Sequence, residues 1–176
     1  MKRITVLLIS ISLTAILFVY VFPNSQSFPN PPSDSVQSKE PADTENPLRR
    51  AYFTNLNRQE VINHYKKEFN SFSFIFYTPR LNYPPEESAT IIRDQTRSTY
   101  LEEIVHPLRE SLYINGFEPK SEKDTIIIEG KRWNQKIIVR YVPSSFTTRL
   151  VVTLLFGISF YLVLNEALNL IYFKKK

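Results

Sequence analysis

The sequence predicts a small α+β domain held between two membrane-spanning helices. Three observations carry this prediction: an uncharged apolar run near the N-terminus, a longer apolar run at the C-terminus, and a middle segment in which helical and strand patterns alternate. We expect two or three helices packed on a three- or four-stranded, mainly antiparallel sheet. The middle segment has about 95 residues, which is enough to bury a core of its own.

The first apolar run, Ile4–Phe22, has no charged residue and follows Lys2 and Arg3. As a helix it measures about 28 Å, close to the thickness of a bilayer core. A cleaved signal peptide has a shorter apolar region than this one, and it has small residues at its cleavage site, which are missing here. We therefore expect residues 4–22 to form an uncleaved transmembrane helix rather than a signal peptide.

The second apolar run, Leu150–Phe173, ends in Lys174–Lys176 and contains one charge, Glu166. Its 15 Leu, Ile, Val and Phe residues favour insertion by about 5–9 kcal/mol, which outweighs the roughly 2.5–3.5 kcal/mol that a carboxylate costs. Two spans place both ends on one side, and the lysines and arginines at the termini outnumber Arg149. We expect a two-pass cell-membrane protein with residues 1–3 and 174–176 cytoplasmic and residues 23–149 extracytoplasmic.

Charge is distributed so that the middle of the chain is neutral. Six of the 22 Lys and Arg residues flank the spans, and one of the 17 Asp and Glu residues lies inside a span, which leaves 16 of each sign between residues 23 and 148. A nucleic-acid-binding protein needs a basic face, so no nucleic-acid partner is expected. No cofactor is expected either, because the chain has no cysteine and its three glycines are not clustered.

The domain is expected at residues 49–143. Residues 23–48 hold six of the twelve prolines and read as a disordered linker, whereas the junction to the second span, residues 144–149, is short. Asn57 and Glu60 have capping-box spacing and predict a helix over Arg58–Phe69. A second helix is predicted over Glu86–Arg93, after two prolines.

A third helix is predicted from Thr99 to Asn115, either separate from the second helix or continuous with it, because five apolar residues recur at helical spacing: Leu101, Ile104, Val105, Leu108 and Leu112. Gly116 would end this helix and Pro107 would kink or break it. Strand patterns occupy three further regions. They are Ser71–Tyr77, a short edge strand at Ala51–Thr54, and a hairpin of Asp124–Glu129 and Gln135–Val142 around Gly130.

Two groups of polar residues in the domain are candidate binding sites. Glu103 and His106 would share one face of the third helix, and His64 on the first helix could complete a metal site. Solvated helix faces explain these residues better, so no metal is expected. Four arginines around residues 84–116 could receive a carboxylate or phosphate, although pairing with acidic neighbours is favoured; they are Arg80, Arg93, Arg97 and Arg109.

The second span carries residues suited to helix contacts. Thr153 and Gly157 form a small-residue pair that permits close approach of another helix. Asn165, Glu166 and Asn169 form a polar patch with three interpretations: hydrogen bonds to another membrane helix, a carboxylate reaching toward the cytoplasmic interface, or an ion pathway.

These observations favour a non-enzymatic scaffold or partner-binding protein of the cell envelope. The chain lacks the motifs of hydrolases and of nucleotide-dependent enzymes. The expected partners are the lipid bilayer and another membrane helix, from a second copy or from a different protein. The alternatives are a metal-dependent enzyme or binder that uses the Glu/His cluster, and an accessory subunit of a transporter.

Overall fold

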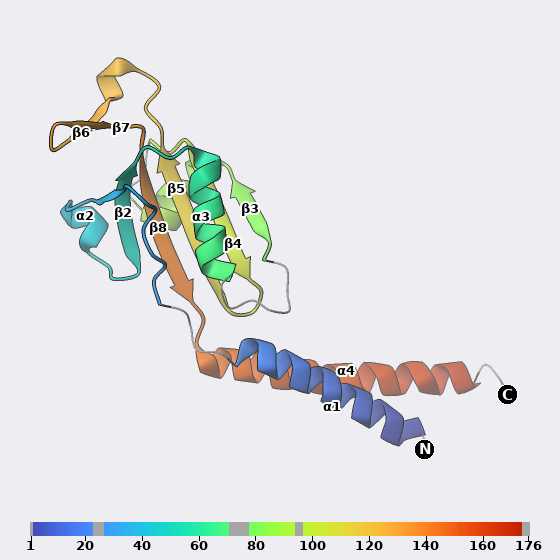
Figure 1. The fold of residues 1–176 in the computed structure, drawn as a ribbon. Coiled ribbons are helices and arrows are strands. Elements are labelled where there is room, and N and C mark those ends of the chain that lie inside the picture. Colours follow the sequence, from blue (N-terminus) through green and yellow to red (C-terminus); the bar gives the residue numbers. More distant parts are fainter. Residues whose placement is uncertain (1, 23–26, 71–77, 94–96, 174–176) are drawn as a thin grey trace. The chain divides into compact units, whose positions relative to one another are not determined.

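The computed structural model describes residues 2–22, 27–70, 78–93 and 97–173. The strand predicted at Ser71–Tyr77 lies outside the described residues. The chain divides into two compact units: residues 26–143 form one, and the two ends of the chain, residues 1–25 and 144–176, form the other. Figure 1 shows a sheet crossed by the helix α3 in the first unit and two long helices, α1 and α4, in the second.

The first unit is an α+β domain built on a six-stranded sheet in which all neighbouring strands are antiparallel. The strand order is β1-β2-β8-β5-β4-β3, so the last strand of the domain lies between β2 and β5. The sheet is therefore larger than the three or four strands expected. Its strands are β1 (Val36–Gln37), β2 (Arg49–Thr54), β3 (Arg80–Tyr83), β4 (Tyr100–His106), β5 (Glu110–Phe117) and β8 (Gln135–Pro143).

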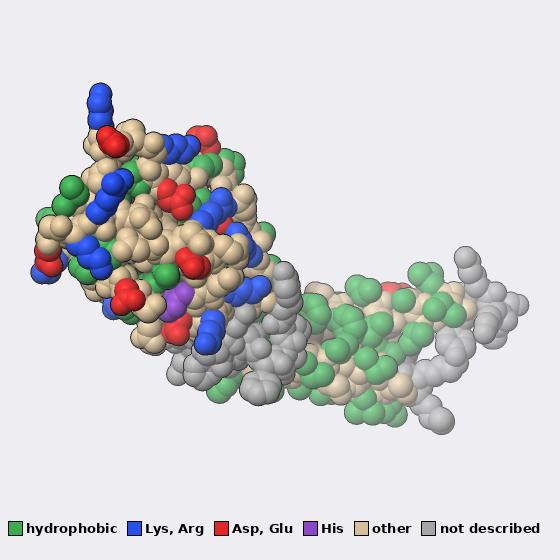
Figure 2. Space-filling view, turned by 45° about the horizontal axis from the view of Figure 1, so that its top comes forward, with side chains coloured by type: hydrophobic (Ala, Val, Ile, Leu, Met, Phe, Trp, Pro, Cys, Tyr) green, Lys and Arg blue, Asp and Glu red, His purple; other side chains and the backbone are tan. Residues whose placement is uncertain are grey.

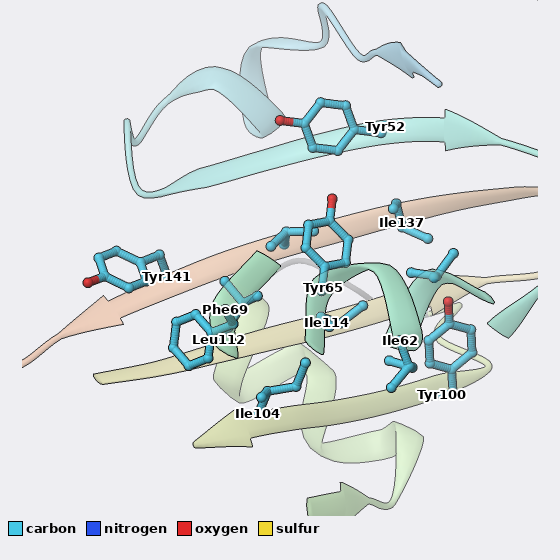
Figure 3. Close-up of a cluster of buried hydrophobic side chains, with 12 residues drawn as sticks. Tyr52, Ile62, Tyr65, Phe69, Tyr100, Ile104, Leu112, Ile114, Ile137 and Tyr141 are labelled. Atoms are coloured by element: carbon cyan, nitrogen blue, oxygen red, sulfur yellow. The ribbon is translucent and has the colours of Figure 1, made fainter. Parts of the chain in front are cut away.

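One face of the sheet is covered by the helix α3 (Arg58–Asn70), which confirms the first predicted helix. The capping box is present: the amide of Glu60 donates to Asn57 Oδ1 at 3.0 Å, and the amide of Asn57 donates to Glu60 Oε2 at 2.7 Å. Figure 3 shows the side chains of α3 pointing onto those of the strands. This main core comprises Tyr52, Val61, Ile62, Tyr65, Phe69, Tyr100, Ile104, Leu112, Ile114, Ile137, Val139 and Tyr141.

The opposite face carries two short helical segments instead of the predicted helix at Glu86–Arg93. A 3₁₀ turn, η1, covers Pro85–Glu87, and a π-helical turn, η2, covers Ala89–Arg93. Ile92 is buried there against the sheet in a second, smaller apolar cluster with Ala51, Leu101 and Ile138. The proline-rich start was read correctly, but too few apolar residues follow it to bury the stripe of a longer α-helix.

The third predicted helix, Thr99–Asn115, is wrong: this segment forms the hairpin β4–β5. Because β4 is buried on both faces, its apolar residues do not alternate with polar ones as those of a half-exposed strand do. It also carries two buried charges, Glu102 and Glu103, which in the sequence resemble the polar face of a helix. Pro107 and Leu108 lie in the turn, where Leu108 has a positive φ of 63°. The described residues of the domain consequently contain fewer helices than expected.

The predicted hairpin around Gly130 exists, but with a different second strand. Gly130 has a positive φ of 76° in the turn that joins β6 (Ile126–Ile128) to β7 (Lys131–Trp133), and these two strands form a separate sheet. The segment at Gln135–Val142 instead enters the main sheet as β8. The predicted strand at Ala51–Thr54 belongs to β2, which is not an edge strand because β1 pairs with it on its other side.

Residues 27–48, expected to be part of a disordered linker, pack on the domain. They contain β1 and the helical turn α2 (Pro41–Thr44). Phe28 packs on the main core under the guanidinium of Arg50, which lies 4.4 Å from the ring centroid. Asp43 is 1% exposed and pairs with Lys136 at 2.7 Å. Long-range anchors of this kind leave no periodic pattern in the sequence.

The second unit consists of α1 (Lys2–Val21) and α4 (Phe146–Phe173). By length and composition both helices can cross a membrane: Ile4–Val21 has a mean hydropathy of 2.6 and Phe146–Ile171 one of 1.8. Figure 2 shows apolar side chains over the visible face of these helices, whereas acidic and basic side chains are interspersed over that of the domain. α4 begins inside the expected junction at 144–149, so it includes Arg149.

Gly116 offers a test of the β4–β5 hairpin. It lies opposite Tyr100 in the ladder, and a Cβ there would overlap the Tyr100 ring. We expect Gly116→Ala to lower the free energy of unfolding by about 1–3 kcal/mol, as overpacking does. Chemical denaturation followed by the fluorescence of Trp133, the single tryptophan, measures this effect. In a Tyr100→Leu background the same substitution should cost far less; an equal cost in both backgrounds would contradict this packing.

Candidate functional site

The helices α1 and α4 pack closely where their side chains are small. A Cβ on Gly157 would lie only 2.5 Å from Thr14 Oγ1, so the glycine permits the contact. Thr153 is 1% exposed, and its hydroxyl donates to the Arg149 carbonyl at 2.8 Å. At one end, Arg149 Nη1 donates to the carbonyl of Val21 at 2.9 Å, which satisfies an orphan acceptor at the end of α1. The pair is antiparallel.

The polar patch on α4 has two half-buried members and one exposed one. Asn165 and Asn169 are partly covered, whereas Glu166 is exposed beside them. Spacing of four residues places the two asparagines on one face of the helix. Amide side chains in this position can donate hydrogen bonds to, and accept them from, a neighbouring helix.

The Glu and His side chains considered as a candidate metal site do not come together. Glu103 and His106 are three residues apart on the strand β4, so they point to opposite faces of the sheet rather than to one face of a helix. His64 lies on α3, where its Nε2 is 3.0 Å from the carbonyl of Asn30. Within the ranges that the structure describes, no group of three or more His, Cys, Asp or Glu side chains could hold a metal ion.

His106 has a packing environment instead. Its ring stacks on Phe69 with centroids 4.1 Å apart, and its Nδ1 is 2.8 Å from Glu110 Oε1. Arg109 Nη2 lies 2.9 Å from the same carboxylate oxygen. All three polar side chains are at most 3% exposed. This buried carboxylate, in contact with a histidine and an arginine, ties the two strands together at the β4–β5 turn and offers no access to a substrate.

Glu102 lies on the α3-covered face of β4 and is fully buried between two arginines. Arg58 Nε from α3 and Arg80 Nη2 from β3 each donate to Glu102 Oε1 at 2.6 Å, and Arg80 Nε contacts the other oxygen. Two charge-assisted hydrogen bonds to Oε1 and an ion-pair contact to Oε2 offset part of the cost of burying the carboxylate. This cluster joins the helix, the central hairpin and the edge strand β3.

A row of polar side chains crosses the other face of the sheet. The strand register places Arg49 opposite Arg140, Arg140 opposite Tyr113, and Tyr113 opposite Glu103. The hydroxyl of Tyr83 donates to Glu103 Oε2, and this bond to a carboxylate raises the pKa of Tyr83. Burial, followed by the charge of Glu103, raises the pKa of Tyr113. Both hydroxyls therefore stay protonated and act as hydrogen-bond donors.

The four arginines considered as anion receptors are paired. Arg80 contacts Glu102 and Arg109 contacts Glu110, while Arg97 lies 3.3 Å from Asp124 and Arg93 lies 3.7 Å from Glu45. Each of the four therefore has an acidic neighbour, and three of these neighbours come from distant segments. Sequence reasoning did not single out Arg49 and Arg140, because only the β2–β8 register brings them together.

No protein-family model, curated protein or solved structure matches the chain. Its function is therefore argued from its own residues.

In the Glu102 cluster, removing the carboxylate and removing the two arginines should lower the free energy of unfolding by different amounts. Glu102→Gln leaves arginines whose side chains are 38% and 32% exposed and can reach water, so we expect a loss of about 1.5–3 kcal/mol. Arg58→Gln combined with Arg80→Gln leaves a fully buried carboxylate, and we expect a larger loss, of at least about 3–5 kcal/mol.

Denaturant unfolding of the three proteins measures the difference. Arg97→Gln, at an ion pair on the surface, is the control and should change the free energy of unfolding by less than about 1 kcal/mol. Equal losses for Glu102→Gln and the double arginine variant would contradict a buried carboxylate clamped by two partly exposed cations.

Proposed function

We propose that the chain is a two-pass membrane protein of the cell envelope that scaffolds or binds a partner through its helix pair. The observation that carries the membrane placement is the outer surface of α1 and α4, where large apolar side chains are exposed on both helices. An apolar surface of this extent is stable in lipid and not in water. Examples that are at least 50% exposed are Ile4, Leu8, Ile11, Ile16, Val19, Leu154, Leu155, Ile158, Leu162, Val163, Leu170 and Ile171.

In this proposal the domain at residues 26–143 lies outside the cytoplasm. The support is the positive-inside rule, because Lys2, Arg3 and Lys174–Lys176 gather at the chain ends. Arg149, the basic residue at the opposite end of α4, is 4% exposed and bonded to a backbone carbonyl of α1. Its charge is therefore held within the helix pair.

The proposed partner is another transmembrane helix. Hydrogen-bonding side chains inside a membrane need polar partners, and Asn165 and Asn169 share one half-buried face of α4. Glu166 is exposed next to them, which suits a carboxylate that reaches toward the cytoplasmic interface. A helix that presents amides to this face can belong to a second copy of the chain or to a different protein.

The partner contact is tested by Asn165→Leu combined with Asn169→Leu, with and without Glu166→Leu. Two interhelical hydrogen bonds of about 0.6 kcal/mol each correspond to roughly eightfold weaker association. The measurement is the molar mass of the complex extracted in mild detergent, together with the proteins that co-purify. Val163→Leu, on an exposed apolar position, is the control. Unchanged mass and unchanged partners in the asparagine variants would contradict the proposal.

A further inference from the structure

A cavity of about 460 Å³ opens on the face of the sheet that η2 covers. We call it the arginine cavity, because three of its lining residues are arginines from three separate segments: β2, η2 and β8. Its volume falls in the range of small-molecule sites. The lining residues used below are Arg49, Arg93, Arg140, Glu45, Asn46 and Ile92.

Two of the arginines, Arg49 and Arg140, lie directly opposite each other on the neighbouring strands β2 and β8. The amide of Tyr141 donates to the carbonyl of Leu48 at 2.8 Å, so these two residues form a hydrogen-bonded pair. The next pair, Arg49 and Arg140, is then a non-hydrogen-bonded pair, in which Cα atoms lie about 4.5 Å apart and side chains approach most closely. Like charges directly opposite each other destabilise a sheet.

Neighbouring carboxylates neutralise these charges only in part. Asp43 lies 3.8 Å from Arg49 but is also bound by Lys136 at 2.7 Å, and Lys136 contacts Glu40 at the same distance. Glu45 lies 3.7 Å from Arg93. Among the described residues that line the arginine cavity, three are arginines and one, Glu45, is a carboxylate.

The hydrogen bonds of the described residues leave one buried donor of Arg49 without an acceptor. Arg140 Nη1 donates to the carbonyl of Ile91, and Arg49 Nη2 reaches the carbonyl of Arg93 at 3.5 Å. Arg49 is only 6% exposed, and its Nε–H has no hydrogen-bond partner among the described residues. A buried, charged donor without an acceptor is costly. An anion in the cavity would supply that acceptor.

The backbone at Arg93 is also unusual. Arg93 has a φ of 61°, a conformation that few residues other than glycine adopt. This conformation occurs at the residue that ends η2 and lines the cavity. Strained backbone of this kind concentrates at ligand sites, which agrees with the charge argument.

We propose that the arginine cavity binds a small oxyanion, a phosphate or a carboxylate group, between Arg49, Arg93 and Arg140. Guanidinium groups match both groups with paired hydrogen bonds, and an oxyanion adds the negative charge that the cavity lacks. The oxyanion can come from a free metabolite or from a lipid headgroup. This site is independent of the helix contact proposed above.

The test uses the full chain in nanodiscs of phosphatidylcholine, titrated with inorganic phosphate and, separately, with citrate, against chloride at equal ionic strength. We expect saturable binding of at least one of the two anions by calorimetry. Arg49→Gln should weaken it about tenfold or more, because it removes a charge-assisted bond from a buried site. Arg93→Gln, whose side chain is 68% exposed, should weaken it about threefold with little risk to folding.

Arg132→Gln is the matched control, because Arg132 is an exposed arginine on β7 and not part of the arginine cavity. It should leave the affinity unchanged. Nanodiscs that contain phosphatidic acid distinguish the two sources: competition with free phosphate would identify a lipid headgroup as the ligand. The proposal is overturned if neither anion binds saturably and the chain shows no binding of phosphatidic acid that Arg93→Gln weakens. It is also overturned if Arg132→Gln weakens anion binding as much as Arg93→Gln does.

Discussion

The domain depends on the position of β8 between β2 and β5. One face of β8 contributes Ile137, Val139 and Tyr141 to the main core under α3. The opposite face contributes Ile138 and Arg140 to the side of the sheet that η2 covers. Along both of its edges, β8 forms hydrogen-bonded ladders with strands that are distant in sequence, β2 and β5. The placement of this one strand therefore completes the core, and its pairing with β2 brings Arg49 opposite Arg140 in the arginine cavity.

Elements with a strong local signal could be predicted from the sequence. The capping box of Asn57 and Glu60 located α3, and Gly130 located a hairpin turn. The β4–β5 hairpin could not be predicted, because Glu102 looks like a solvent-facing residue until Arg58 and Arg80 are placed beside it. Buried ion pairs hide the alternation of a strand, since their partners come from other elements.

The candidate sites follow the same division. The small-residue pair of Thr153 and Gly157 is visible within α4, although its contact with Thr14 depends on how α1 packs. Arg49 and Arg140 are 91 positions apart and belong to no common pattern, so only the sheet register identifies them as a pair. Conversely, the spacing of Glu103 and His106 places both side chains on one face only in a helix. In the strand β4 the same spacing places them on opposite faces.

The proposed function requires α1 and α4 to lie in a membrane with the domain outside the cytoplasm. Because the native chain has no cysteine, single cysteines can report which side each segment occupies. Lys39, whose side chain is 89% exposed on the domain, and Lys176, at the chain end, are suitable positions. A membrane-impermeant maleimide should label Lys39→Cys in intact cells and Lys176→Cys only after permeabilisation. Labelling of both positions in intact cells, or the reverse pattern, would contradict a two-pass protein with cytoplasmic ends.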